Sequence, residues 1–385
     1  MANLILPSGD TFLSGNETSP QLPEHLEHQV AVDNHGHDFA LAAPDANEGI
    51  RHGHPSAVIT VVRDPNHKLG KRFALDSDGI VSKKSAVHLS FGIAVQHDVP
   101  TPESFVELLN KVGADPNAAI INASFDGIPV GEEFAILSEC EIEKRLDIPG
   151  SDREKQKGVH TIEHDGKNIK VVGRFKENIR PSSWQLLDRD VDAQTPAEFA
   201  SLSDVEWLSV LAKILPGIDQ VTTVSTRSTS SRVMLDGKPV GGGNSHVWFM
   251  LNKADDAERI RVAIIVRAAQ AELTWPKPRY SRSEPGKVVG QSLATIVDPS
   301  VWTPGRLVFI GKPVVGDGLT VEPLAPTIHR RKQDSLDTAA VVLPDARKVR
   351  EITRKAGGEM SITTGHSGLR ISANDLTLDT ELETQ

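Results

Sequence analysis

The sequence predicts an α+β fold, because short β-branched runs alternate with longer stretches whose apolar side chains have helical spacing. Residues 57–62 and 221–226 are rich in Val, Ile and Thr, which is typical of strands. Apolar side chains recur every three or four positions over 101–113 and 255–273, as along the buried side of a helix. The chain has 385 residues, of which 38% are hydrophobic, so it can bury a sizeable core in two moderate domains or one large one.

The N-terminal segment, residues 1–55, is predicted to be a flexible tail. It is rich in Asn, Pro, Gly and His and shows little periodicity. Two His-Gly-His units, at 35–37 and 52–54, could bind a transition metal. The glycine between the histidines and the lack of a surrounding apolar strand favour a flexible polar segment instead.

The first structured part is predicted over residues 56–172. Thr101 and Pro102 are suited to begin a helix, and Gly113 is suited to end it. The densely charged stretch 139–167 is expected to be a connector or an exposed excursion. Strands are expected at 57–62, at 73–82 as two strands around the turn 76–79, and at 87–95, 118–122, 134–138 and 168–172.

The second structured part is predicted over residues 173–326. One helix is expected to begin at Thr195 and Pro196 and to end at 216–217, and the stretch 255–273 is the other helix. Strands are expected at 184–187, 221–226, 246–251, 293–297 and 306–310. Residues 327–385 are expected to be a C-terminal helical extension, with a helix over 345–355, followed by an acidic linker from 375 onward that leads to a further domain.

Two acids stand at alternate positions where the strand 184–187 ends. In a strand, residues two apart point the same way, so the carboxylates of Asp188 and Asp190 are expected side by side. Exposure in a solvated loop is the common explanation, and a hard cation such as Mg²⁺ or Mn²⁺ between them is the other. A calcium loop of the EF-hand type is excluded, because its sixth and twelfth places hold Ala193 and Phe199 instead of Gly and Glu.

Further polar residues follow other strands. Residues 227–232 combine hydroxyls with two arginines, which suits a phosphate or an anionic substrate, and a plain turn explains them equally well. His246 opens an apolar strand after a glycine-rich run, where a lone histidine is more often structural than functional. Asp298 ends the run 293–297 and so repeats the geometry of Asp188.

The charge distribution points to one basic loop. The net charge of −10 argues against a protein that coats nucleic acid with a uniformly positive surface, although a local groove stays compatible with it. Between 277 and 287 four basic residues face one acid, and the only tyrosine lies among them. This loop is the best electrostatic candidate for holding a polynucleotide through Lys277, Arg279, Tyr280, Arg282 and Lys287.

Cys140 is the only cysteine, so an internal disulfide and a cysteine-based zinc module are excluded. No apolar run reaches the length needed to cross a bilayer, and the N-terminus lacks the features of a signal peptide. The expected location is therefore the cytoplasm, with no membrane partner.

Together, the stretches 187–190, 244–247 and 296–298 resemble in order and spacing the three motifs of the archaeo-eukaryotic primase superfamily. Those motifs are an apolar run into Asp-x-Asp, a His that opens a strand after a small polar residue, and a final Asp after an apolar run. The surroundings at 228–232 and 298–307 are similar to primase-polymerase domains of plasmids, phages and integrated elements. The resemblance covers residues 56–326 and departs from the family at Asn244, where a Ser is usual, with Ser245 next to it.

The resemblance implies two fused α/β subdomains, the second an RRM-like sheet that carries the acids. It implies that Asp188, Asp190 and Asp298 bind two divalent cations, Mg²⁺ or Mn²⁺. It also implies that the incoming nucleoside triphosphate is bound by residues of the second and third motifs and their surroundings, namely His246, Ser230, Arg232, Ser245 and Arg306. The expected activity is synthesis of primers on single-stranded DNA from ribo- or deoxyribonucleoside triphosphates, for replication of a mobile element and with a helicase domain or protein as a partner.

Two other functions stay open on the sequence. A rolling-circle initiator or relaxase would use paired histidines for a metal and a tyrosine as the DNA nucleophile, and His35, His37 and Tyr280 are the residues of these types. A non-catalytic replication module would bind single strands through its sheet and the 277–287 loop, independently of the three aspartates.

Overall fold

The computed structural model describes residues 57–84, 89–192, 194–240, 244–281, 284, 287–343 and 351. The contacts of the chain divide it into two units, residues 1–50 and 51–385, and every described residue belongs to the second unit. No helix in the described ranges has both the length and the apolar character needed to cross a membrane. The expected N-terminal tail with its histidine units, the linker from 375 onward and, apart from Glu351, the expected helix 345–355 lie outside these residues.

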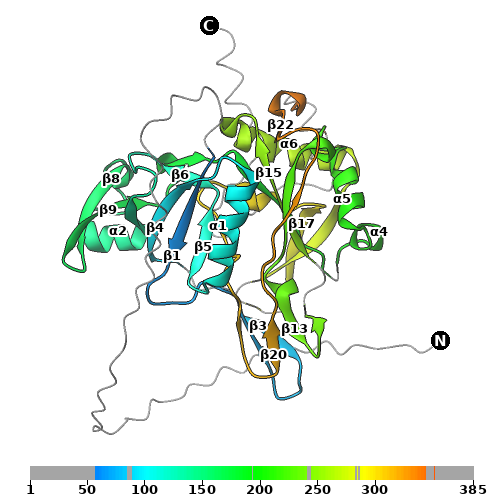
Figure 1. The fold of residues 1–385 in the computed structure, drawn as a ribbon, viewed down its shortest axis with the longest axis horizontal. Coiled ribbons are helices and arrows are strands. Elements are labelled where there is room, and N and C mark those ends of the chain that lie inside the picture. The colour runs from blue at the N-terminus through cyan, green and yellow to red at the C-terminus, as the bar shows by residue number, and fades with distance from the viewer. Residues whose placement is uncertain are drawn as a thin grey trace. The chain divides into compact units, whose positions relative to one another are not determined.

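The first sheet has seven strands and is antiparallel except where β7 runs parallel to β9. Figure 1 shows β1, β4 and β5 together with helix α1 in blue and cyan. Every residue of β5 is buried, because its sequence Ala-Ala-Ile-Ile carries no polar side chain. The order across the sheet is β18 (Leu307–Val308), β5 (Ala118–Ile121), β1 (Val58–Arg63), β4 (Phe91–Asp98), β7 (Glu133–Leu137), β9 (Lys167–Gly173) and β8 (Val159–His164).

Helix α1 (Pro102–Ala114) joins the two sheets. Thr101 and Ser104 form a reciprocal capping box at its start, as the Thr-Pro sequence predicts. On its buried side Phe105 stacks on Trp184 with 4.3 Å between ring centroids and meets the edge of Trp248 at 5.1 Å. These residues belong to one hydrophobic cluster that includes strands of both sheets, so the two predicted parts share a core.

The second sheet contains the strands from which the acids and the histidine emerge. Its order is β11 (Trp184–Arg189), β15 (Ser245–Leu251), β12 (Thr223–Arg227) and β21 (Thr327–His329), all antiparallel, and β22 (Ser335–Leu336) adds to β15 in parallel. All seven residues of β15 are buried. Helices α5 (Asp204–Leu211) and α6 (Ala257–Gln270) supply further residues of the shared core. This combination of antiparallel strands and helices agrees with the expected α+β class. The sheet alone does not identify a known fold.

Smaller strand groups complete the fold. A small lobe combines β2 (Arg72–Leu75), β3 (Val81–Lys84) and β19 (Val314–Val315) with β13 (Val233–Leu235), β14 (Lys238–Pro239) and β20 (Leu319–Val321). Figure 1 shows β3, β13 and β20 close together, and Phe73, Val233 and Leu319 form the buried centre of this lobe. Elsewhere β6 (Ala123–Phe125) pairs with β10 (Ile179–Pro181), and β16 (Thr274–Tyr280) pairs with β17 (Val288–Thr295).

Four expectations are corrected. The stretch 139–167 is structured, with α2 (Glu139–Leu146), α3 (Arg153–Gln156) and β8. The helix expected from Thr195 is broken into α4 (Ala197–Ala200) and α5, and residues 277–280 of the expected basic loop 277–287 belong to β16, whose hairpin partner β17 begins at 288. The boundary at 326 is too early, because β21 and β22 belong to the second sheet.

The described residues also form short 3-10 helices, namely η1 (Lys176–Asn178), η2 (Ile218–Gln220), η3 (Ser230–Arg232), η4 (Ala254–Asp256), η5 (Pro299–Trp302) and η6 (Thr338–Ala340).

Candidate active site

The pairing of β11 with β15 places Asp188 directly opposite His246. Trp184 and Leu186 point to the same side of β11 as Asp188, and both are buried, so the strand brings a carboxylate to the end of an apolar face. The His246 side chain is 9% exposed and that of Asp188 is 23% exposed, and His246 Nε2 lies 3.6 Å from Asp188 Oδ1. The two residues thus lie side by side on paired strands.

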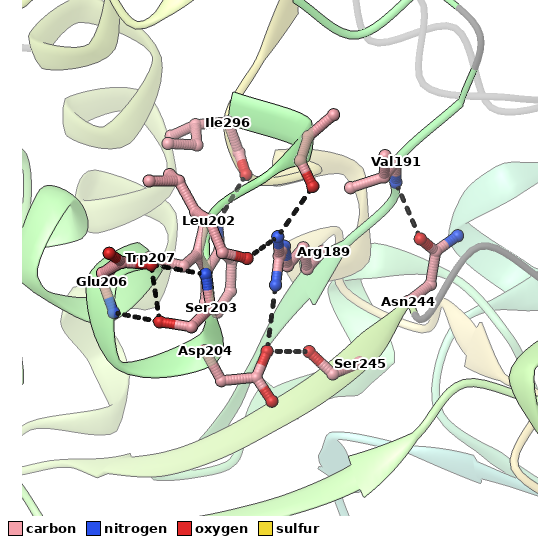
Figure 2. A network of polar contacts seen from close by, with 11 residues as sticks. Arg189, Val191, Leu202, Ser203, Asp204, Glu206, Trp207, Asn244, Ser245 and Ile296 are labelled. Carbon is pink, nitrogen blue, oxygen red and sulfur yellow. Dashed lines mark hydrogen bonds and ion pairs between the residues drawn. The ribbon is translucent and has the colours of Figure 1, made fainter. Parts of the chain in front are cut away.

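Asn244 holds the chain just beyond β11. Its side-chain Nδ2 donates to Asp190 Oδ1 at 2.9 Å, and its Oδ1 accepts the Val191 backbone N–H at 2.9 Å. Figure 2 shows the second of these bonds reaching across from Asn244 to Val191. An asparagine can donate and accept at once, whereas a serine hydroxyl is shorter and could not span both groups. Asn244 therefore has a structural role of its own at this position.

Asp298 is brought beside β11 by backbone and tryptophan contacts. Its N–H donates to the Asp188 carbonyl at 3.0 Å, and Trp302 Nε1 donates to the Leu186 carbonyl at 2.7 Å. The Asp298 carboxylate accepts the backbone N–H of Ser300 at 2.8 Å and the Ser300 hydroxyl at 2.7 Å, which caps η5. The three aspartates thus come from two distant segments to one edge of the second sheet.

The electrostatics of this edge reflect the crowding of the acids. Burial first, and then the charges of Asp298 and Asp190, raise the pKa of Asp188 to about 7. Burial and the charge of Lys71 lower the pKa of His246 to about 3, so its imidazole is neutral at physiological pH. His246 Nδ1 is buried and has no hydrogen-bond partner among the described residues, which is unusual for a buried ring nitrogen.

Two cations face the acids, and sequence reasoning missed one of them. Lys71 and Arg306 both act to lower the pKa of Asp188, and neither side chain forms an ion pair with a described residue. Arg306 was expected here from the resemblance. Lys71 precedes β2 in another part of the chain, and its spacing to the acids gives no signal in the sequence.

Ser245 faces away from His246, which corrects its expected role at the nucleotide. Neighbouring residues on a strand point to opposite faces, and the Ser245 hydroxyl donates to Asp204 Oδ1 at 3.2 Å on the other side of the sheet. Figure 2 shows this carboxylate shared with Arg189, whose Nη1 donates to the same oxygen at 3.0 Å and whose Nη2 donates to the carbonyls of residues 200 and 202. Ser245 thus helps to fix the start of α5.

The expected role of Arg232 at the nucleotide is also corrected, because its guanidinium is hydrogen-bonded inside the protein. The side chain is 2% exposed. It donates to three backbone carbonyls, those of Glu322 at 3.1 Å, Ile310 at 3.0 Å and Gly113 at 3.2 Å. Burial lowers its pKa to about 10, so it keeps its charge while joining α1 to the segments after β18 and β20. Ser230, by contrast, is only partly buried, and its hydroxyl lies 3.2 Å from that of Ser228.

Arg232→Met is expected to lower the stability of the protein by about 3 kcal/mol or more without raising the KM for nucleotide specifically. The substitution leaves three buried carbonyls without their donors, and the lost charge contacts nothing at the acids. Thermal or denaturant unfolding, with nucleotide kinetics below the unfolding transition, measures both effects. A stable variant with a selectively raised KM for nucleotide would show that Arg232 does contact the phosphates.

Both lysines of the expected basic loop are held by acids in the described structure. Lys277 forms an ion pair with Asp192, and Lys287 pairs with Glu284 at 2.8 Å. Tyr280 is 52% exposed and Arg279 lies in β16, whereas Arg282 is outside the described residues. The ion pair of Lys277 ties the hairpin to the segment that follows Asp190.

No preformed metal site is present in the part of the chain that the structure describes, since no three His, Cys, Asp or Glu side chains lie close enough to hold an ion. The donors are nevertheless chemically suited to Mg²⁺ or Mn²⁺, because both prefer carboxylate oxygens. Burial is the main cause of the raised pKa of Asp188, and repulsion by the charges of Asp298 and Asp190 adds to it. A cation between them would relieve that repulsion by drawing them together.

Comparison with known proteins adds no relative from which a role could be transferred. The chain matches no family model, no curated protein and no solved structure. The interpretation of this site therefore depends on the positions and chemistry of its own residues.

Proposed function

We propose that this protein is a DNA primase-polymerase that synthesises primers on single-stranded DNA from nucleoside triphosphates. The observation that carries the proposal is the meeting of Asp188, Asp190 and Asp298 at one sheet edge beside the buried His246. Acids that are distant in sequence rarely gather in this way for stability alone, because their mutual repulsion opposes folding.

The carboxylates of Asp188, Asp190 and Asp298 would hold two divalent cations, Mg²⁺ or Mn²⁺. Such ions activate the attacking 3′-hydroxyl and neutralise the charge on the leaving pyrophosphate. Asn244 keeps Asp190 in place, and the Ser300 contacts orient Asp298. His246, as a neutral imidazole, would donate a hydrogen bond to a phosphate oxygen, and Lys71 with Arg306 would supply positive charge at the triphosphate.

The partners in this proposal are a single-stranded DNA template, nucleoside or deoxynucleoside triphosphates and a helicase domain or protein. The cytoplasm supplies these nucleotides, and replication of a plasmid, phage or integrated element is the setting in which such an enzyme acts.

The test is synthesis on a circular single-stranded DNA that carries no primer, with labelled nucleotides and Mg²⁺ or Mn²⁺. Wild type is expected to produce labelled strands that grow from new starts, separately with ribo- and deoxyribonucleotides. A chain that binds the circle but incorporates neither kind of nucleotide with either metal would overturn the proposal.

A non-catalytic single-strand-binding module is the second candidate, and the lack of a preformed metal group among the described residues favours it. It would bind the same circle without consuming triphosphate, and its affinity would not change when the three aspartates are replaced. The relaxase alternative would instead form a covalent adduct with DNA that is lost in Tyr280→Phe.

A further inference from the structure

The ribbon formed by β2 and β3 is basic although the whole chain is acidic. Arg72, Lys83 and Lys84 lie on its strands, Lys71 precedes it, and neither strand contains an acid. The two acids of the ribbon lie in its turn, where Asp76 accepts the backbone N–H groups of residues 78 and 80. None of the four cations forms an ion pair or side-chain hydrogen bond with a described residue.

Like charges face each other within this ribbon. Arg72 pairs with Lys84 across the two strands. Burial first, and then the charge of Lys83, lower the pKa of Lys71. Like charges directly opposite one another destabilise an antiparallel pair. Asp188 and Asp190 act against the repulsion at Lys71 only, and Arg72, Lys83 and Lys84 form no ion pair with a described acid, so an external anion is the partner that would offset their charge.

The base of the ribbon is fixed beside the acids of the second sheet. Lys71 interacts electrostatically with Asp188 and Asp190. Its carbonyl accepts the N–H of Val314 at 3.0 Å, and the N–H of Gly70 donates to the Pro116 carbonyl at 3.0 Å. A Cβ atom at Gly70 would lie 2.5 Å from the carbonyl oxygen of residue 312, so only glycine allows this close approach.

The body of the ribbon is equally well anchored. Phe73 is 3% exposed and packs with Val233 and Leu319 in the centre of the small lobe. Arg72, Lys83 and Lys84 are exposed, so the lobe presents charge on a supported strand pair. The paired lysines of the β16–β17 hairpin offer less free charge.

We propose that the β2–β3 ribbon holds the phosphate backbone of the single-stranded DNA through Arg72, Lys83 and Lys84 and leads it past Lys71 to Asp188 and Asp190. Three exposed cations, with Arg72 and Lys84 opposite each other and Lys83 opposite Phe73, suit a polymer of repeated charges better than a single phosphate. The only aromatic residue of the ribbon is buried, so the contact is with the backbone and independent of base sequence. This site rests on the proposed function and replaces the β16–β17 hairpin as the main contact with the template.

The test compares two triple variants. Arg72→Gln, Lys83→Gln and Lys84→Gln together remove the charge of the ribbon, whereas Lys111→Gln, Lys167→Gln and Lys253→Gln remove the same charge from exposed lysines elsewhere. Binding of a fluorescent oligothymidine is measured by anisotropy over a salt series, without nucleotide or divalent metal. Circular dichroism and thermal unfolding check the fold, and the ribbon variant is expected to unfold at an unchanged or higher temperature because a repulsion is removed.

The ribbon variant is expected to bind at least about tenfold more weakly near 0.1 M salt, and the slope of log K against log salt is expected to fall by about 2, since each phosphate contact on a single strand contributes about 0.7. The control variant should keep the wild-type slope. Equal affinities and slopes for the two folded variants would overturn the inference.

The same assay separates this inference from the proposed function. Asp188→Asn with Asp190→Asn removes the acids without touching the ribbon, so this variant should bind the oligonucleotide at least as well as wild type. If the wild type synthesises primers and the ribbon variant binds DNA normally, only the proposed role of the ribbon is refuted. If the wild type synthesises no primers and the ribbon variant loses DNA binding, the proposed polymerase activity is refuted and the ribbon stays a single-strand-binding surface.

Discussion

Asp188→Asn together with Asp190→Asn is expected to reduce nucleotide incorporation by at least about a thousandfold. Both substitutions keep the size of the side chain, and an asparagine at 190 can still accept the hydrogen bond from Asn244 Nδ2. The loss would therefore come from charge rather than from shape. Primer synthesis and extension of a preformed primer, measured side by side, quantify the effect.

The matched control is Asp192→Asn, the next acid at an alternate position. Asp192 is exposed and forms an ion pair with Lys277. Its slight burial acts to raise its pKa, but its hydrogen bonds outweigh that effect and keep the pKa below the usual value. An exposed ion pair contributes little, so the control should change activity by less than about threefold. The proposed roles of Asp188 and Asp190 would be refuted if the double variant kept wild-type synthesis, or if the control were as inactive as the double variant.

The double variant also has an expected effect on stability. Burial, and then the charges of Asp298 and Asp190, raise the pKa of Asp188, so ionised Asp188 opposes folding and the metal-free double variant should unfold at a higher temperature near pH 8. Gain of stability with loss of activity is typical of functional groups that the fold tolerates at a cost. An inactive variant that is less stable would instead indicate a structural role for the two acids.

Several strands and two of the expected helices were predictable because their burial follows a simple period. The β-branched run of β1, the capped helix α1 and the apolar strand β15 all lie where expected. Helix α2 was missed because Ile142 is its only buried residue, so its charged sequence carries almost no hydrophobic stripe. The helix after Thr195 was overextended because Ser203 begins a new helix with its own capping box.

At the site, sequence order located the acids and the histidine but not their supporting residues. That Ser245 faces the opposite side from His246 follows from strand alternation alone, so that signal was present in the sequence. The burial of Arg232 was not foreseeable, because a guanidinium that binds carbonyls and one that binds phosphate look alike in sequence. Lys71 reaches the acids only through the packing of the small lobe, which no local pattern encodes.

The affinity for Mn²⁺ or Mg²⁺ is expected to fall by about fiftyfold between pH 7 and pH 5. The pKa of Asp188 is raised to about 7, so a cation must displace a proton from this carboxyl below neutral pH. His246 has its pKa lowered to about 3 and stays neutral over the whole range, so it adds no second step. Calorimetric titration of the folded protein with metal at pH 5, 6, 7 and 8 measures the curve directly, and an unchanged affinity from pH 5 to 7 would exclude Asp188 as a ligand.

The sign of the linked stability change distinguishes this carboxyl from ordinary surface acids. A raised pKa means that Asp188 stabilises the metal-free fold below about pH 4, its value in the unfolded chain, and that this contribution is lost as the pH rises through 7. A cation that binds the ionised group restores stability in the same range. The stabilisation by metal in thermal unfolding should therefore grow with pH up to about 8 and then level off.

Two variants should shift the midpoint of the metal titration in opposite directions. Asp298→Asn removes a negative charge that raises the pKa of Asp188, so the midpoint should move to lower pH, although the loss of a ligand also weakens binding at pH 8. Lys71→Gln removes a positive charge that lowers the same pKa, so the midpoint should move to higher pH. Shifts in the same direction, or none, would show that the three acids and Lys71 do not act on one another as the structure places them.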